Sequence, residues 1–130
     1  MAAAPSRKQA LDLIEERAAM CRALLDGLRR SRPQATLLCE RFVESLDKHR
    51  SARDAVRQRF GLPSGAPQST PIADVDLAGL RQALDDLMTA YAEGLPAMAD
   101  ASTVARLARD MVDVSRLRTV IDLWVESEAA

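Results

Sequence analysis

A helical stripe between the two phenylalanines is the sequence feature that most constrains the fold. Phe42 and Phe60 are 18 residues apart. On an α-helix that separation is about five full turns, so both side chains point in the same direction. Between them, at steps of three or four residues, lie Leu46, His49, Arg53 and Val56. This spacing predicts a long helix with one buried face rather than a strand, in which side chains alternate between two faces.

Three further segments carry the same periodicity, from Leu11 to Leu28, from Leu77 to Leu95 and from Val104 to Trp124. Together the four stripes predict helices at about residues 6–30, 34–60, 72–95 and 101–127. An aromatic content of only 3% argues against a β-rich fold, which normally uses aromatic strands. We therefore expect one all-α domain over residues 1–130, an antiparallel four-helix bundle with crossing angles of about 20°.

The ends of the helices carry recognisable signals. Ser6 to Gln9 and Ser31 to Gln34 both fit the capping box, in which a hydroxyl and an amide side chain satisfy backbone amides at a helix start. Asp100 or Ser102 is suited to cap the fourth helix. The third helix is expected to begin near Thr70 and Pro71, or at Asp74.

The segment "GLPSGAPQSTP", residues 61–71, is a Gly/Pro-rich linker with two glycines and three prolines. Such a composition does not continue a helix. The break between the first two helices is only a few residues long, so they should form an antiparallel hairpin. We expect two helical hairpins joined by this linker, which is long enough to cross over the bundle.

Several features bear on where the protein resides. No apolar run approaches the roughly 20 residues that a membrane span needs, and the first residues lack the apolar core of a secretory signal. Cys21 and Cys39 fall on apolar stripes, which favours two buried thiols over a disulfide. These observations predict a cytoplasmic protein that does not associate with membranes.

Three polar residues interrupt the apolar stripes: His49, Arg53 and Arg118. A long arginine stem can be buried while its guanidinium reaches the edge of the seam. Alternatively, the three groups pair with acids inside the bundle, with Asp110 or Asp113 on the fourth helix or Asp85 on the third. In the third alternative, part of the second helix faces a partner instead of the core.

Motifs for catalysis and for metal or cofactor binding are missing from the sequence. His49 has Leu46 three residues before it, so the Glu-x-x-His pair of a di-iron bundle is not present. One histidine and two separated cysteines do not make a zinc pattern. An enzyme would require a closed pocket that gathers His49, Arg53 and Arg118, for example around a small dianion. We expect a protein that is not an enzyme and that has no cofactor and no metal.

Charge is distributed unevenly along the chain. Residues 1–60 contain 13 basic and 8 acidic residues, a net charge of +5, whereas residues 61–130 contain 5 and 11, a net charge of −6. This asymmetry indicates either complementary halves of one bundle or a basic surface for an acidic partner. The residues that could contact nucleic-acid phosphates are Lys48, Arg50, Arg53, Arg57 and Arg59 in the second helix and Arg29, Arg30 and Arg32 at the hairpin turn.

The regular seams and the lack of a catalytic motif favour a non-catalytic interaction protein, such as an adaptor, a chaperone or a small assembly subunit, that binds another protein or itself. Trp124 and Val120 drift out of their seam by about 20° per heptad, so they are candidates for partner contacts. His49 and Arg53 are further candidates because they interrupt a buried face. The alternative is a helical subunit that binds nucleic-acid backbone through the second helix within a larger complex.

Overall fold

The computed structural model describes residues 5–64 and 75–129, and these residues are almost entirely helical. The four helices are α1 (Arg7–Ser31), α2 (Thr36–Arg59), α3 (Leu77–Gly94) and α4 (Ala101–Ala129). Short 3₁₀ turns, η1 (Pro33–Ala35) and η2 (Leu95–Met98), precede α2 and α4. The described part of the chain contains no strand, which confirms the predicted all-α class.

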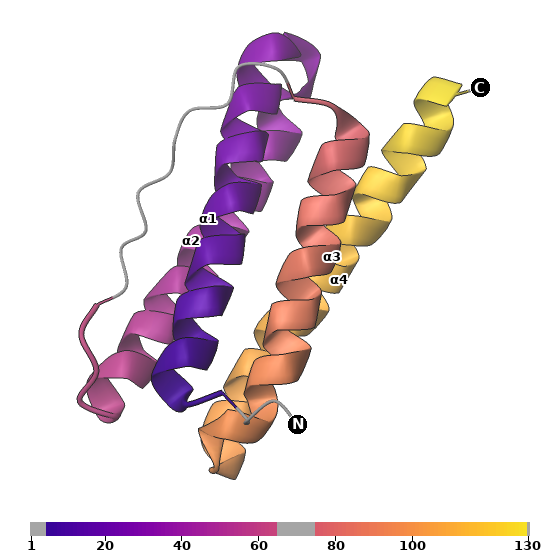
Figure 1. Ribbon diagram of the computed structural model, residues 1–130. Helices are drawn as coiled ribbons and strands as arrows, with labels where there is room; N and C mark the ends of the chain where they lie inside the picture. Colours follow the sequence, from indigo (N-terminus) through magenta and orange to yellow (C-terminus); the bar gives the residue numbers. More distant parts are fainter. Residues whose placement is uncertain (1–4, 65–74, 130) are drawn as a thin grey trace.

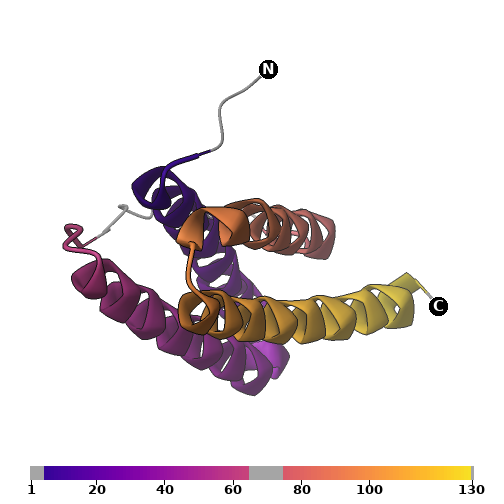
Figure 2. The ribbon, with the colours of Figure 1, turned by 90° about the horizontal axis from the view of Figure 1, so that it is seen from below.

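The helices form two antiparallel hairpins, α1 with α2 and α3 with α4 (Figure 1). α1 runs upward in this view, α2 and α3 run downward, and α4 runs upward again. Seen from below, the order around the bundle is α1, α2, α4, α3 (Figure 2). Each helix is therefore antiparallel to both of its neighbours, and the predicted antiparallel bundle is confirmed.

The predicted stripes form the core. Leu11, Ile14, Leu80, Leu84 and Leu107 are fully buried, as are the thiol-bearing Cys21 and the phenolic Tyr91. Cys21 and Cys39 are buried and free, as expected. Burial raises the pKa of the Cys21 thiol to about 12, so this cysteine stays protonated at neutral pH. None of the described helices is long and apolar enough to cross a membrane.

α1 and α3 approach closely near the start of α1, where small residues face each other. A Cβ atom placed on Gly94 would lie 3.3 Å from the Cβ of Ala10 and 3.4 Å from Cδ1 of Ile14. The missing side chain of Gly94 therefore sets the distance between the two helices at this crossing.

The capping box at Ser6 is present: the amide of Gln9 donates to Ser6 Oγ at 3.1 Å, and the amide of Ser6 donates to Gln9 Oε1 at 2.9 Å. The prediction of a second capping box, at Ser31, was wrong. Ser31 is the last residue of α1, and its hydroxyl donates to the carbonyl of Leu28. Pro33 starts the 3₁₀ turn η1 instead, so α2 begins later, at Thr36, without a side-chain cap.

The start of α3 also differs from the prediction. Thr70, Pro71 and Asp74 lie outside the described residues, and α3 begins at Leu77 after an N-cap at Asp76. The Asp76 carboxylate accepts a hydrogen bond from the amide of Gly79 at 2.6 Å, which satisfies one free amide of the first turn. Asp100 directly precedes α4, as expected, whereas Ser102 lies within the helix.

Candidate functional site

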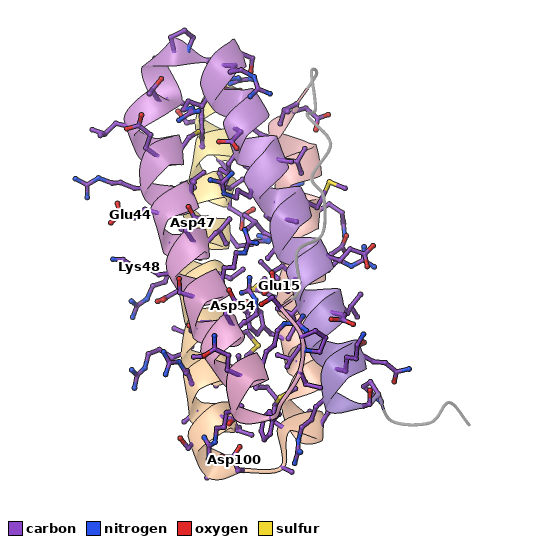
Figure 3. The ribbon with its side chains drawn as sticks, turned by 90° about the vertical axis from the view of Figure 1, so that its left-hand side faces the viewer. Glu15, Glu44, Asp47, Lys48, Asp54 and Asp100 are labelled. Carbon is purple, nitrogen blue, oxygen red and sulfur yellow. The ribbon has the colours of Figure 1, made fainter. Side chains whose placement is uncertain are left out.

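Arg53 lies in the core, where it joins three helices. Its side chain is only 1% exposed; Nε donates to Oε1 of Glu15 on α1 at 2.6 Å, and Nη1 donates to the hydroxyl of Tyr91 on α3 at 2.7 Å. Figure 3 shows Glu15 in the space between α1 and α2. Burial raises the pKa of Tyr91 to about 12, although the charge of Arg53 opposes that rise. The Glu15–Arg53–Tyr91 cluster fixes the register of α1, α2 and α3.

Arg57, one turn further along α2, is equally buried. Its Nη2 lies 2.9 Å from Oδ1 of Asp12, and its Nη1 donates to the carbonyl of Pro63 at 3.4 Å. The pKa of the Asp12 carboxyl is lowered mainly by a hydrogen bond from Lys8, and the contact with Arg57 lowers it further. Arg57 therefore holds the end of α2 against α1 and the chain that leaves α2.

His49 faces α4 from the middle of α2. Its Nε2 is 3.0 Å from Oδ2 of Asp113 and 3.9 Å from Oδ1 of Asp110. His49 and Asp110 are only 3% and 7% exposed. Burial raises the pKa of Asp110, while the nearby charges of His49 and Arg53 act in the opposite direction.

Arg118 makes the corresponding contact between α3 and α4. Its Nε donates to Oδ1 of Asp85 at 2.7 Å, and its Nη1 also pairs with Asp122. Of the three alternatives for the polar residues in the stripes, pairing with acids inside the bundle is confirmed for the buried His49 and Arg53, whereas Arg118 pairs with acids at the partly exposed edge of the α3–α4 seam. The partners Asp113 and Asp85 were among those predicted, whereas Glu15, the partner of Arg53, was not.

These three polar groups serve different helix pairs. His49 joins α2 to α4, Arg53 joins α2 to α1 and α3, and Arg118 joins α4 to α3. This arrangement therefore does not gather His49, Arg53 and Arg118 in one pocket, as an enzyme built on these three residues would require.

A groove runs between α2 and α4. These two helices are the most loosely packed neighbours in the bundle. α4 packs mainly on α3 and diverges from α2 toward its C-terminus (Figure 2). The floor of the groove contains His49, Asp110 and Asp113, and small residues such as Ala52 and Ala105 leave a hollow of about 600 Å³. A second hollow of about 370 Å³ continues it along Arg41, Arg116 and Leu117. We refer to the two together as the α2–α4 groove.

The rim of this groove is basic. Its exposed cationic side chains are Arg41, Lys48, Arg106, Arg109 and Arg116. Within the described part of the chain, Lys48 alone among them has a carboxylate within 4.0 Å, that of Glu44 at 3.7 Å. Figure 3 shows Glu44 and Lys48 projecting outward from α2. The rim therefore presents positive charge that is not neutralised by local ion pairs.

The predicted nucleic-acid residues do not form one surface. Arg53 and Arg57 are in the core, so they were wrongly assigned to phosphate contacts. Arg29 lies near Asp26 and Glu40, Arg32 pairs with Glu128, and Arg59 pairs with Asp100. Lys48, Arg50 and Arg30 are exposed, and Lys48 alone of these lines the groove. The pairs of Arg32 and Arg59 join the basic first half of the chain to the acidic second half.

The predicted partner-binding residues are also only partly exposed to a possible partner. His49 and Arg53 are buried, so they do not form a docking surface as predicted. Trp124 is half-buried and donates from Nε1 to Glu128 at 3.2 Å, and the guanidinium carbon of Arg32 lies over its ring, 5.7 Å from the centroid. Val120 is 36% exposed, and the neighbouring Leu123 is more exposed still.

Asp110 and Asp113 were predicted as alternative partners of the polar residues in the stripes, whereas the rim arginines of α4 were not predicted as part of a site. A signal for them exists: Arg106, Arg109, Asp113 and Arg116 recur at steps of three and four residues, which places them on one side of α4. That this side faces His49 depends on the packing of α4 against α2.

Comparisons with protein-family models, with curated proteins and with solved structures found no match.

Proposed function

We propose that this chain is a non-catalytic helical interaction protein that binds an acidic segment of another protein in the α2–α4 groove. The observation that carries the proposal is the basic rim along the open edge of the bundle. Roles as an adaptor, a chaperone or a small assembly subunit all fit this binding mode. A cytoplasmic location is consistent with two free thiols.

The shape of the groove favours a helical segment. Two diverging helices leave an elongated depression, and an added amphipathic helix is the common occupant of such a depression. Ala105 is exposed within it, and the buried Ala52 and Leu117 lie at its base. The rim arginines would contact acids of the partner and accelerate its association, as complementary charges do at protein interfaces.

A protein partner fits this groove better than nucleic acid does. The carboxylates of Glu44 and Asp113 interrupt the row of basic residues, which suits the separate acidic side chains of a protein helix better than the continuous row of phosphates in nucleic acid. The chain also has few aromatic residues on which bases could stack. Nucleic acid is therefore the competing outcome of the experiment below.

The experiment compares affinity purification from the native host with three forms of the protein. Arg109→Ala with Arg116→Ala removes two rim charges. Arg17→Ala with Arg30→Ala removes the same charge from exposed positions of α1 and serves as the matched control. We expect acidic proteins to be depleted about 10-fold or more with the groove variant and retained with the control, and binding of the purified partner to weaken with salt.

Two results would contradict the proposal. One is the same set of partners with the groove variant and with the wild type. The other is capture that disappears on nuclease treatment, which would assign the rim to nucleic acid. Circular dichroism of all three forms checks that helicity is unchanged, since the substituted side chains are exposed.

A further inference from the structure

The floor of the α2–α4 groove holds three groups that could bind one metal ion. One ligand atom from each of His49, Asp110 and Asp113 lies within 4.8 Å of the other two. His49 comes from α2, and the two aspartates are one turn apart on α4. We propose that these three residues form a binding site for a divalent transition-metal ion, with Zn²⁺ as the best-fitting candidate. The inference does not depend on the proposed function.

The distances between the groups fit a tetrahedral ion. Two ligands at 2.0–2.2 Å from a tetrahedral zinc are separated by about 3.4 Å. The observed separations are 3.0 Å between His49 Nε2 and Asp113 Oδ2 and 3.9 Å between His49 Nε2 and Asp110 Oδ1. These values lie on either side of the required one, and the ligand atoms of Asp110 and Asp113 lie within 4.8 Å of each other, so side-chain rotations can bring the three atoms to coordinating distance.

Asp110 provides a second, independent indication of a ligand. The residue is 7% exposed and its side chain 10% exposed, and its Oδ2 has no hydrogen-bond partner among the described residues. Burying a carboxylate oxygen without a partner is costly, and metal coordination is one of the ways in which buried charges are satisfied. The guanidinium of Arg53 does not remove this cost by a direct bond, because in the described part of the chain it donates to Glu15 and Tyr91.

The donor set selects the class of metal. An imidazole with two carboxylates suits Zn²⁺ and similar transition metals better than Mg²⁺ or Ca²⁺, which prefer oxygen ligands alone. Three protein ligands leave a fourth position, and here it would face the hollow of about 600 Å³ beside Arg106 and Arg109. An anionic ligand or water is the natural occupant of that position.

His49 has the geometry to coordinate through Nε2, which requires its hydrogen to be on Nδ1. Nδ1 is buried and has no acceptor in the described part of the chain. Metal-bound histidines usually donate this hydrogen to a neighbouring group, and loss of such a partner lowers affinity about 10–100-fold. We therefore expect weaker binding than at zinc sites with a supporting acceptor.

The test is calorimetric titration of the full-length protein with Zn²⁺, with Mg²⁺ in a parallel arm. Asp113→Asn and His49→Ala each remove one ligand. Asp47→Asn is the matched control, because it removes an exposed carboxylate of α2 outside the cluster. We expect one Zn²⁺ per chain, affinity at least about 10-fold lower for both ligand variants, unchanged affinity for Asp47→Asn and no comparable binding of Mg²⁺.

Cobalt(II) substitution provides a second readout that excludes the cysteines as ligands. Coordination by nitrogen and oxygen gives no thiolate charge-transfer band, whereas binding at Cys21 or Cys39 would produce one. Asp113 is partly exposed, so Asp113→Asn should fold even if His49→Ala does not. No Zn²⁺ binding at millimolar concentration, equal binding by wild type and Asp113→Asn, or a thiolate band would each overturn the proposal.

Discussion

At the scale of single residues, a buried charge pair carries a large desolvation cost. Arg53 and Glu15 are almost completely inaccessible to water, and their contact at 2.6 Å crosses from α2 to α1. A buried pair adds little net stability, because desolvation offsets the attraction. Its value lies in specificity, since only one register of the two helices brings the groups together.

Removing one partner of this pair should therefore be much worse than removing both. Arg53→Met leaves Glu15 buried without its counter-charge, and we expect it to lower the free energy of unfolding by about 3–5 kcal/mol. The double variant Glu15→Leu/Arg53→Met should lose less than the single variant. Urea unfolding followed by circular dichroism measures all three forms.

The exposed pair of Lys48 and Glu44 supplies the control for that comparison. Both side chains are largely exposed, so Lys48→Met should change the free energy of unfolding by at most about 1 kcal/mol. A double variant that is less stable than Arg53→Met would show that the pair contributes stability rather than register, contrary to this account.

The partners of the polar residues were only partly predictable from the sequence. Spacing alone placed Arg53 on the buried face of its helix, because helical periodicity is a local property. Its partner depends on which helix packs against that face. Glu15 lies on the flank of the α1 stripe and had no signal that separated it from the neighbouring surface acid Glu16. Asp110 and Asp113 were predicted as alternative partners, and the structure shows that both lie near His49 because α4 packs against α2 there.

At the scale of helices, one glycine governs a close approach between α1 and α3. Gly94 faces Ala10 and Ile14 across the α1–α3 interface. Helix–helix distances depend on the side chains at the contact, so a larger residue here must push the two helices apart or distort them.

Gly94→Leu should lower the free energy of unfolding by about 1–3 kcal/mol, because the added atoms have no space between α1 and α3. Ala92→Leu, at an exposed position two residues earlier in α3, is the control and should have an effect of about 0.5 kcal/mol or less. Chemical denaturation compares the two variants. Equal stability of both would mean that the interface relaxes without cost.

Helix boundaries show a different limit of the sequence signals. The same capping-box pattern occurs at Ser6 and at Ser31, but only the first one forms. Pro33 allows the chain to make a 3₁₀ turn, and Ser31 then completes α1 instead of starting α2. Local signals marked the turn correctly, whereas the exact residue depended on how α1 and α2 pack at their junction.

At the scale of the whole molecule, the two hairpins depend on each other. α1 lies between α2 and α3, and its contacts with α3 are at least as extensive as those within its own hairpin. Arg53 of the first hairpin donates to Tyr91 of the second, while His49 faces Asp113 across α2 and α4. Each hairpin alone would expose a large part of the core.

We therefore expect that neither half folds alone. Fragments of residues 1–64 and 75–130 should each show reduced helicity and no cooperative thermal transition by circular dichroism. An equimolar mixture should recover helicity, because the main interface does not require the covalent connection. A cooperative transition in either isolated fragment would contradict this dependence, and the intact chain under the same conditions is the control.

The antiparallel packing of α1 on α3 has a consequence for the rate of folding. The contact of Ala10 with Gly94 joins positions that are separated by most of the chain. Native contacts between distant positions require the closure of long loops, and proteins rich in them fold more slowly. Local contacts within each hairpin can form early without making it stable, and the core closes only when the two hairpins dock. The time that this chain spends with apolar surface exposed is thus determined by docking rather than by helix formation.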